Sequence, residues 1–342
     1  MSEKNPPLKI CDTIVQPGER VSLGLPTPEF YSCSPSFIPI HVIHGKKRGP
    51  VLLICAAAHG DEMNGVAIIQ KLLEMQLVNK IRGTLIVVPV INIFGLIARS
   101  RNLPGEHDFK DIFPGSESGT FSSRLAYRFS EKVLSLATHC IDLQTGSLGN
   151  YRVPQVHTNI ENEEAYSLAR SFSAPIIMHT KSDRGMLWKM HHEDPIPVLV
   201  YESGESSRMD ELSISVGVKG VVRVMRDLGM IGVSRKENKE SKEKSAVVIR
   251  STQLIRSPCS GIFFLRKKLG SLIRQNEVIA SIVDPFGAGK KREVISEHEG
   301  VIIASSFHPL VNEGEPIVHL GKTDYEAGEN IFLQSGSIGP VA

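Results

Sequence analysis

The chain has 342 residues, of which 41% are hydrophobic and 22% are charged, and its formal net charge is +2. This balance is that of an ordinary globular protein with room for two domains and a large core. It gives no electrostatic footprint for nucleic acid or a membrane surface, and no run of about 18 apolar residues occurs, so we expect neither as a partner.

The cysteines and the N-terminus indicate the compartment. Five cysteines are scattered along the chain and are never spaced Cys-x-x-Cys, which supports neither a disulfide framework nor a cysteine zinc site. The first residues contain no apolar segment of the kind that directs export. These features predict a cytoplasmic protein.

Residues 1–37 are rich in Pro, Gly and Ser and are expected to form an N-terminal extension on the surface. A strand is predicted at residues 38–44, where apolar residues alternate. The apolar run 51–56 opens into His59-Gly60-Asp61-Glu62, and an amphipathic run follows at residues 66–73. This pattern predicts a buried parallel strand, a tight loop and a helix. The loop therefore lies at the carboxyl end of a strand, where open α/β sheets bind ligands.

His59 and Glu62 in this loop are candidate metal ligands. They are three residues apart, which is close enough for an imidazole nitrogen and a carboxylate oxygen to hold one ion. His-x-x-Glu after a strand also occurs by chance, so the alternative interpretation is an ordinary loop.

A long segment without periodicity follows the next strand. That strand is predicted at residues 83–90 and ends near Asn92, and the irregular segment covers residues 98–119. It contains Arg101 and the run Asp108-Phe109-Lys110-Asp111. A loop of this length inside a compact domain is commonly functional.

Helices and strands alternate from there to about residue 232. The apolar spacing predicts helices at residues 120–136, 161–172 and 210–228 and strands at residues 140–143, 175–178 and 197–201. Two of these strands run into polar stretches, Gln144-Thr145-Gly146 and Glu202-Ser203-Gly204. The alternation predicts a doubly wound α/β domain over residues 38–233.

The remaining chain has a different character. Residues 234–245 form a charged linker, and residues 246–325 are strand-rich and weakly repetitive, so that 257–262 resembles 296–301. The repeat predicts a small all-β barrel or sandwich, and this part resembles a biotinyl or lipoyl carrier domain. It lacks the carrier's modified-lysine motif, so we expect an unmodified accessory domain. Residues 326–342 form a C-terminal tail.

Three motifs resemble those of the succinylglutamate desuccinylase and aspartoacylase family, which is related to the zinc carboxypeptidases. They are His59-Gly60-Asp61-Glu62, Asp142-Leu143-Gln144-Thr145-Gly146 and Tyr201-Glu202-Ser203-Gly204. The likeness covers about residues 38–322. It implies a zinc-carboxypeptidase-like domain with a mixed sheet, and hydrolysis of a linear amide bond in an N-acyl amine or N-acyl amino acid by metal-activated water.

The resemblance implies a role for each candidate residue. His59, Glu62 and Gln144 would hold one Zn²⁺ per chain. Glu202 would act as the general base, and Arg101 would polarise the scissile carbonyl. A small molecule is the expected substrate, and a homo-oligomer is compatible with the sequence.

The substrate-binding positions implied by the family are Lys110, Asp111 and Asn92. Lys110 and Asp111 stand where the family has an Asn-Arg pair that grips the substrate carboxylate, so one charge of that clamp is reversed. A carboxylate grip at this position is therefore not expected.

Gln144 is the second departure, because it replaces the third ligand, a histidine, of the family pattern. A carboxamide oxygen is a weaker zinc ligand than an imidazole, so the site would be weaker or would favour a harder ion such as Mn²⁺. The other histidines that could supply a ligand are His107, His139, His157 and His179, in predicted loops or at predicted strand ends. Two hypotheses stay open: a metal-dependent hydrolase, or a catalytically degenerate binding or regulatory protein on the same scaffold.

Overall fold

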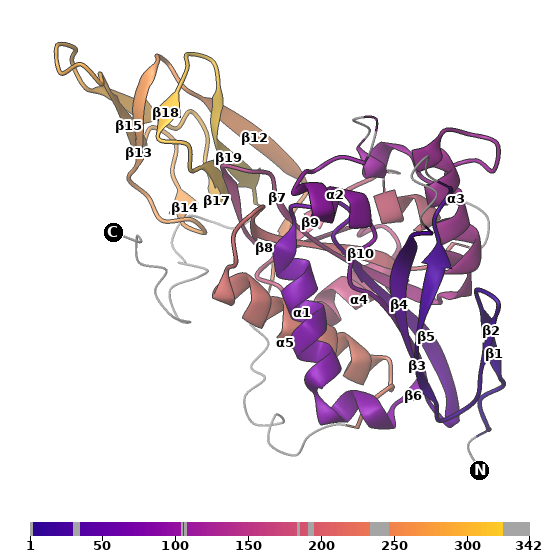
Figure 1. The fold of residues 1–342 in the computed structure, drawn as a ribbon. Helices are drawn as coiled ribbons and strands as arrows, with labels where there is room; N and C mark the ends of the chain where they lie inside the picture. Colours follow the sequence, from indigo (N-terminus) through magenta and orange to yellow (C-terminus); the bar gives the residue numbers. More distant parts are fainter. Residues whose placement is uncertain are drawn as a thin grey trace.

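The computed structural model describes residues 3–29, 35–103, 105, 108–182, 185–190, 195–232 and 246–323. Figure 1 shows a large twisted sheet flanked by helices, with a strand-rich C-terminal part at one end. Three sequence predictions lie mostly or wholly outside the described residues: the linker 234–245, the tail 326–342 and His107.

The helical elements are α1 (Met63–Glu74), α2 (Ile93–Ala98), α3 (Phe121–Lys132), α4 (Glu163–Phe172) and α5 (Glu211–Asp227), with the 3₁₀ turns η1 (Gln76–Lys80), η2 (Phe109–Asp111), η3 (Leu134–Leu136) and η4 (Gly185–Met190). The strands of the first 250 residues are β1 (Leu8–Ile10), β2 (Thr13–Val15), β3 (Arg20–Pro26), β4 (Phe37–His44), β5 (Lys47–Ala56), β6 (Arg82–Val88), β7 (His139–Gly146), β8 (Asn150–Thr158), β9 (Ile176–His179), β10 (Val198–Glu205) and β11 (Val247–Ile249). The C-terminal strands are β12 (Ser251–Arg256), β13 (Gly261–Leu265), β14 (Leu272–Ile273), β15 (Val278–Val283), β16 (Arg292–Ile295), β17 (Gly300–Ser306), β18 (Leu310–Val311) and β19 (Pro316–Lys322). No helix within the described ranges is both long and apolar enough to cross a membrane.

The large sheet is mixed, as predicted. Its strands follow the order β12-β19-β17-β8-β10-β7-β5-β6-β4-β3. The central strands β6, β5, β7 and β10 are parallel, whereas β4 and β8 pair antiparallel on either side of them. From β5 the chain passes through α1 to β6 on one side, and it then returns through α3 to β7 on the other side of β5. The carboxyl ends of β5 and β7 therefore form a topological switch point, where ligands bind in open α/β sheets.

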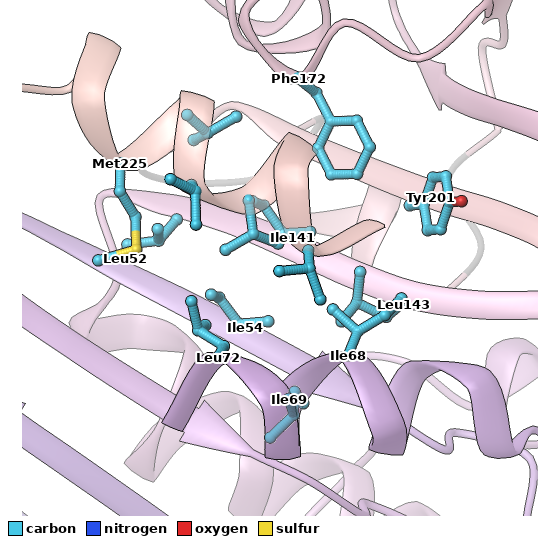
Figure 2. Close-up of a cluster of buried hydrophobic side chains, with 14 of the residues drawn as sticks. Leu52, Ile54, Ile68, Ile69, Leu72, Ile141, Leu143, Phe172, Tyr201 and Met225 are labelled. Carbon is cyan, nitrogen blue, oxygen red and sulfur yellow. The ribbon is translucent and has the colours of Figure 1, made fainter. Parts of the chain in front are cut away.

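Both faces of the sheet are covered, which the apolar strands require. One face packs against α1, α4 and α5, and its core includes Ile68, Phe172 and Met225 (Figure 2). The other face packs against α3 and the β1–β2 hairpin, with Phe129 and Ile10 fully or nearly fully buried. The prediction of an α/β domain with helices on both faces is confirmed.

The structure differs from the sequence prediction in three respects. The predicted surface extension, residues 1–37, contains β1, β2 and β3, and β3 pairs along β4, so the sheet begins at Arg20. β8 was not predicted, because Pro154 and polar side chains at 152, 155 and 157 interrupt its apolar alternation. The predicted strands at residues 140–143 and 197–201 are longer, and their polar ends lie within β7 and β10.

The C-terminal strands continue the main sheet and also form a second sheet. β17 pairs with β8, and β12 and β19 extend the sheet beyond it, whereas β16, β15, β13 and β18 form a separate four-stranded sheet. The repeat seen in the sequence has a structural counterpart: the Ser257 hydroxyl donates to the Cys259 carbonyl at 2.6 Å, and the Ser296 hydroxyl donates to the His298 carbonyl at 2.6 Å. This part of the chain is all-β, as predicted.

Gly60 fixes how closely α2 approaches the loop after β5. A methyl group at Gly60 would lie 1.9 Å from the carbonyl carbon of Gly95, which is backbone and cannot move aside easily. Only glycine therefore fits between His59 and Glu62 at this contact.

We predict that Gly60→Ala lowers the free energy of unfolding by about 1–3 kcal/mol, the usual cost of overpacking a close contact. Urea unfolding of the purified variant measures it. Gly232→Ala is the matched control, because no atom lies within 4 Å of its added methyl group, and we expect a change within about 0.5 kcal/mol. Equal stabilities of the two variants would contradict the contact.

Candidate metal and active site

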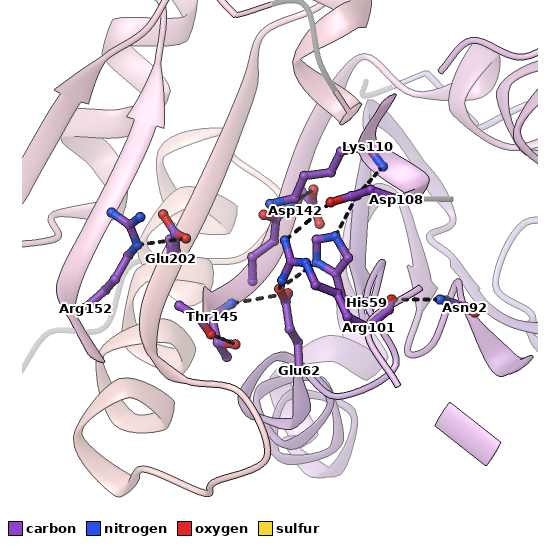
Figure 3. A network of polar contacts seen from close by, with 12 residues as sticks. His59, Glu62, Asn92, Arg101, Asp108, Lys110, Asp142, Thr145, Arg152 and Glu202 are labelled. Carbon is purple, nitrogen blue, oxygen red and sulfur yellow. Dashed lines mark hydrogen bonds and ion pairs between the residues drawn. The ribbon is translucent and has the colours of Figure 1, made fainter. Parts of the chain in front are cut away.

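The candidate residues gather at the switch point. His59 and Glu62 follow β5, and Gln144 lies near the end of β7, where Cys55 pairs with Asp142 in register. The two strand ends that the sequence marked as polar therefore lie side by side. Figure 3 shows the side chains that converge there.

His59 is buried between two carboxylates. Its Nδ1 atom lies 2.6 Å from Glu62 Oε1, and its Nε2 atom lies 2.8 Å from Asp108 Oδ1; the side chains of His59 and Glu62 have no exposed surface. The backbone N–H of Thr145 donates to the second oxygen of Glu62 at 3.2 Å. Glu62 is thus held from the end of β7 as well.

A neutral imidazole carries a single N–H, so one ring nitrogen of His59 would face a carboxylate with its lone pair unless a second proton or a cation lies between them. Burial opposes a charged imidazole, but the hydrogen bonds to Asp108 and Glu62 outweigh burial and raise the pKa of His59. Burial likewise opposes a charged Asp108, yet His59 holds the pKa of Asp108 well below its usual range. The two carboxylates therefore favour a second proton or a cation at His59.

These residues fit a divalent cation. When Nε2–H of His59 donates to Asp108, the Nδ1 lone pair and the Glu62 carboxylate point at the same place, and a carboxylate behind a histidine is the usual support of a zinc ligand. Gln144 donates its side-chain amide to Asp142, so the carboxamide oxygen is the only ligand atom it can offer. In the described part of the chain, no three His, Cys, Asp or Glu side chains gather to hold a metal, so two strong ligands and one weak one are available.

Asp142 is fully buried beneath this site. Burial raises the pKa of Asp142 to about 6, although its hydrogen bond from Gln144 and the charge of Lys110 act in the opposite direction. Lys110 lies on the same side of the site as Asp142 (Figure 3). The side chain of Asp111 is exposed at the end of η2, so the two substitutions in the family's clamp have different surroundings.

Arg101 lies over the two carboxylates. Its Nη1 atom is 3.4 Å from Glu62 Oε1 and its Nη2 atom is 3.5 Å from Asp108 Oδ2. A cavity of about 370 Å³ opens beside Arg101 and is lined also by Phe94 and Leu103. Arg101 therefore borders both the candidate metal position and a space that could admit a ligand.

Asn92 is placed differently from the sequence expectation. Its side-chain oxygen accepts the N–H of Gly95 at 2.7 Å, which caps α2, and its amide donates to the Arg101 carbonyl at 3.3 Å. Both ends of this fully buried carboxamide are engaged. Asn92 positions the loop that carries Arg101, and we do not retain it as a substrate ligand.

Glu202 lies one strand away from Gln144. In the ladder of β7, β10 and β8, Gln144, Glu202 and Gln155 are in register, so their side chains point to the same face of the sheet. The Glu202 carboxylate is 3.1 Å from Arg152 Nε and 3.1 Å from His157 Nε2. Burial would raise the pKa of Glu202, but Arg152 and His157 outweigh it and hold the pKa well below its usual range. The group is ionised at neutral pH.

Sequence analysis missed Asp108 and Arg152, and it did not connect His157 with Glu202. Asp108 was seen only as part of a loop, and the other two belong to the unpredicted strand β8. The alternation of polar residues at 155 and 157 was the available signal. Among the described histidines, His179 lies 4.0 Å from Glu161 and His139 contacts Thr138, so neither completes the His59 site.

Comparison with known proteins identifies the family of this chain. The family model for the succinylglutamate desuccinylase/aspartoacylase catalytic domain matches residues 48–228. A curated relative, the N-alpha-acetyl-L-2,4-diaminobutyric acid deacetylase of Halomonas elongata, is 25% identical over 289 residues, which are 82% of this chain and 84% of the relative.

Two solved structures share the fold. The product-bound ectoine utilization protein EutE (DoeB) from Ruegeria pomeroyi has a TM-score of 0.75 and 22% identity, covering 88% of this chain and 94% of that one. The succinylglutamate desuccinylase/aspartoacylase from Rhodobacter sphaeroides has a TM-score of 0.75 and 20% identity, covering 90% and 96%. At these identities the likeness concerns the fold.

We predict that Asp108→Asn weakens zinc binding by about 10–100-fold, because the carboxylate that orients His59 is lost. Competition with a chromophoric zinc chelator measures the affinity. Asp111→Asn removes an exposed carboxylate three residues away and is the control. Unchanged affinity in Asp108→Asn would show that Asp108 does not support the metal.

Proposed function

Because the chain belongs to the succinylglutamate desuccinylase/aspartoacylase family, we propose that it is a metal-dependent hydrolase that cleaves a linear amide bond in an N-acyl amine or N-acyl amino acid. The observation that carries the proposal is the buried His59–Glu62 pair, backed by Asp108, at the switch point of the sheet. A divalent cation held by His59, Glu62 and the Gln144 oxygen would supply Lewis acidity that polarises the scissile carbonyl and activates water. The family name and that of the Halomonas relative support deacylation.

Glu202 is the proton carrier in this proposal. Its carboxylate is ionised, and it lies at the strand position next to Gln144, within the same polar face. One of its oxygens takes a proton from the attacking water and returns it to the leaving amine nitrogen, so that a carboxylate and a free amine are released. Arg152 and His157 keep Glu202 charged and hold it in place.

Arg101 stabilises charge on the carbonyl oxygen. Its guanidinium lies beside the two carboxylates of the site and borders the cavity next to α2. A fixed cation of this kind favours the transition state, in which negative charge develops on the oxygen under attack.

We also propose that the C-terminal strands form an unmodified accessory domain resembling a biotinyl or lipoyl carrier. The repeated Ser257 and Ser296 hydrogen bonds support two similar halves. Lys290 and Lys291 are exposed between β15 and β16, but the carrier motif around them is absent. This domain supplies no lysine for modification in the proposal.

A second candidate function is ligand binding without catalysis. The carboxamide at the third ligand position favours it, since the described residues provide only two strong ligands. In that case the protein would be a binding or regulatory member of the family.

We predict that Glu202→Gln lowers kcat about 10²–10⁴-fold while zinc affinity stays within a few-fold of the wild type, because a proton acceptor is lost and no ligand is changed. A panel of N-acetyl amines and N-acetyl amino acids, assayed with zinc-loaded and manganese-loaded protein, measures the activity. Glu161→Gln alters an exposed carboxylate away from the site and is the control. Wild-type activity in Glu202→Gln would exclude it as the base.

Gln144→His separates the two candidate functions. If the protein is a hydrolase, the wild type is active with metal, and the variant binds zinc more tightly because an imidazole replaces a carboxamide. If it is a binding protein, the wild type neither retains metal nor cleaves any member of the panel, and zinc appears only in the variant.

A further inference from the structure

We propose that Arg152 binds a carboxylate of the substrate, so that the protein acts on N-acyl amino acids although the family's carboxylate clamp is altered. The inference rests on the proposed function and deepens it, because it names the residue that would bind a substrate carboxylate in place of the altered clamp. The contacts of Arg152 and its neighbours carry the argument.

Arg152 lies at the edge of the site. On β8 it pairs with Gly204 of β10 and with Ala304 of β17, and its stem crosses Gly146 at the end of β7: a methyl group at Gly146 would lie 3.2 Å from Arg152 Cγ. The guanidinium lies beside Glu202, and Glu202 pairs with Gln144 on the neighbouring strand, about 4.8 Å away. A carboxylate only a few bonds from the scissile amide is therefore within its reach.

The two terminal nitrogens of the Arg152 guanidinium are available as hydrogen-bond donors. Its Nε atom faces Glu202 Oε1 at 3.1 Å, and no residue in the described ranges accepts from its two terminal nitrogens. The Arg152 side chain is 20% exposed, so a ligand can reach it. The planar pair of terminal amino groups matches a carboxylate in geometry and charge, and such paired hydrogen bonds are among the strongest in proteins.

More than one positive group surrounds the single negative charge of Glu202. Arg152 and His157 both contact Glu202, and Lys110 also acts on it electrostatically. These three positive or hydrogen-bonding groups offset the charge of Glu202, so Glu202 does not strongly repel a second anion at Arg152. The site thus has room for the charge of a substrate carboxylate.

A second observation points to a ligand beside Glu202, on the face of the sheet that also carries Gln155. Gln155 is in register with Glu202 and fully buried, yet neither its side-chain oxygen nor its nitrogen has a hydrogen-bond partner. An unpaired buried polar group costs about 1–3 kcal/mol. Such a group is tolerated where another state of the protein pairs it, and an occupied site beside Glu202 is that state.

The C-terminal strands contribute His319 to the surroundings of Arg152. His319 pairs with Ala304, which in turn pairs with Arg152, so the three share one row of the sheet. Burial and the charge of Arg152 lower the pKa of His319 to about 4, so it is neutral at pH 7. As a neutral imidazole, His319 can hydrogen-bond to the ligand, while Arg152 supplies the positive charge that binds the carboxylate.

The test compares N-acetyl-L-amino acids with their primary amides, using metal-loaded protein. The wild type is expected to favour the acids by at least tenfold in kcat/KM. Arg152→Lys keeps a positive charge beside Glu202 but loses the planar donor pair, so KM for the acids rises about tenfold or more. Because Arg152 also holds Glu202, kcat falls for acids and amides alike, and the acid-to-amide ratio of kcat/KM is the readout. An unchanged acid-to-amide ratio in Arg152→Lys would overturn the proposal.

His157→Gln is the matched control. His157 contacts the other oxygen of Glu202, so its loss should lower kcat for acids and amides alike and leave their ratio intact. A change of the ratio equal to that of Arg152→Lys would mean that selectivity arises from disturbing Glu202, which contradicts a direct contact. Arg152→Gln serves as a second variant should the lysine variant not fold.

Binding separates a failure of this inference from a failure of the proposed function. If the wild type cleaves neither series, the proposed function is wrong, and calorimetric titration with the N-acetyl acids still tests Arg152. Binding to the wild type that weakens about tenfold in Arg152→Lys supports the carboxylate site. Absent binding, or equal binding by both proteins, contradicts it.

Discussion

A buried imidazole between two carboxylates is the constraint around which this structure is arranged. Burying Glu62 without a partner would be costly, and His59 and the Thr145 amide provide the partners. The same arrangement demands a positive charge between His59 and Glu62, which a proton or a metal can supply. Parallel pairing of β5 with β7 brings the parts together, and glycine at position 60 lets α2 close over them.

The local parts of this arrangement could be predicted from the sequence, and the long-range parts could not. The apolar run before His59 and the helix after it are set by local periodicity, so the loop and its place at a strand end followed directly. Arg152 and His157 act on Glu202 from about fifty residues away, on a strand that a proline and polar side chains conceal. The strands before residue 37 were missed for a similar reason, since turn residues dominate that composition.

Asn92 and Glu202 both follow an apolar strand, but their side chains have different roles. Asn92 lies at a strand end, as a ligand would, yet its carboxamide caps α2 and holds the Arg101 loop. Glu202 also closes an apolar strand, and there the costly buried charge is compensated by two partners, which leaves it ionised and suited to accept a proton. Only the contacts of each side chain distinguish a supporting residue from a reacting one. In the same way, Lys110 and Asp111 alter the family's carboxylate clamp, and our proposal assigns the carboxylate to the terminal nitrogens of Arg152.

The central claim is that a metal ion occupies the point on which His59 Nδ1 and Glu62 Oε1 converge. Anomalous diffraction at the zinc absorption edge, from crystals of protein incubated with zinc, tests it most directly. The account predicts one peak per chain at about 2.0–2.2 Å from both atoms, with the Gln144 oxygen turned toward it. No peak at this position, with His59 still in direct contact with both carboxylates at saturating zinc or manganese, would contradict the account.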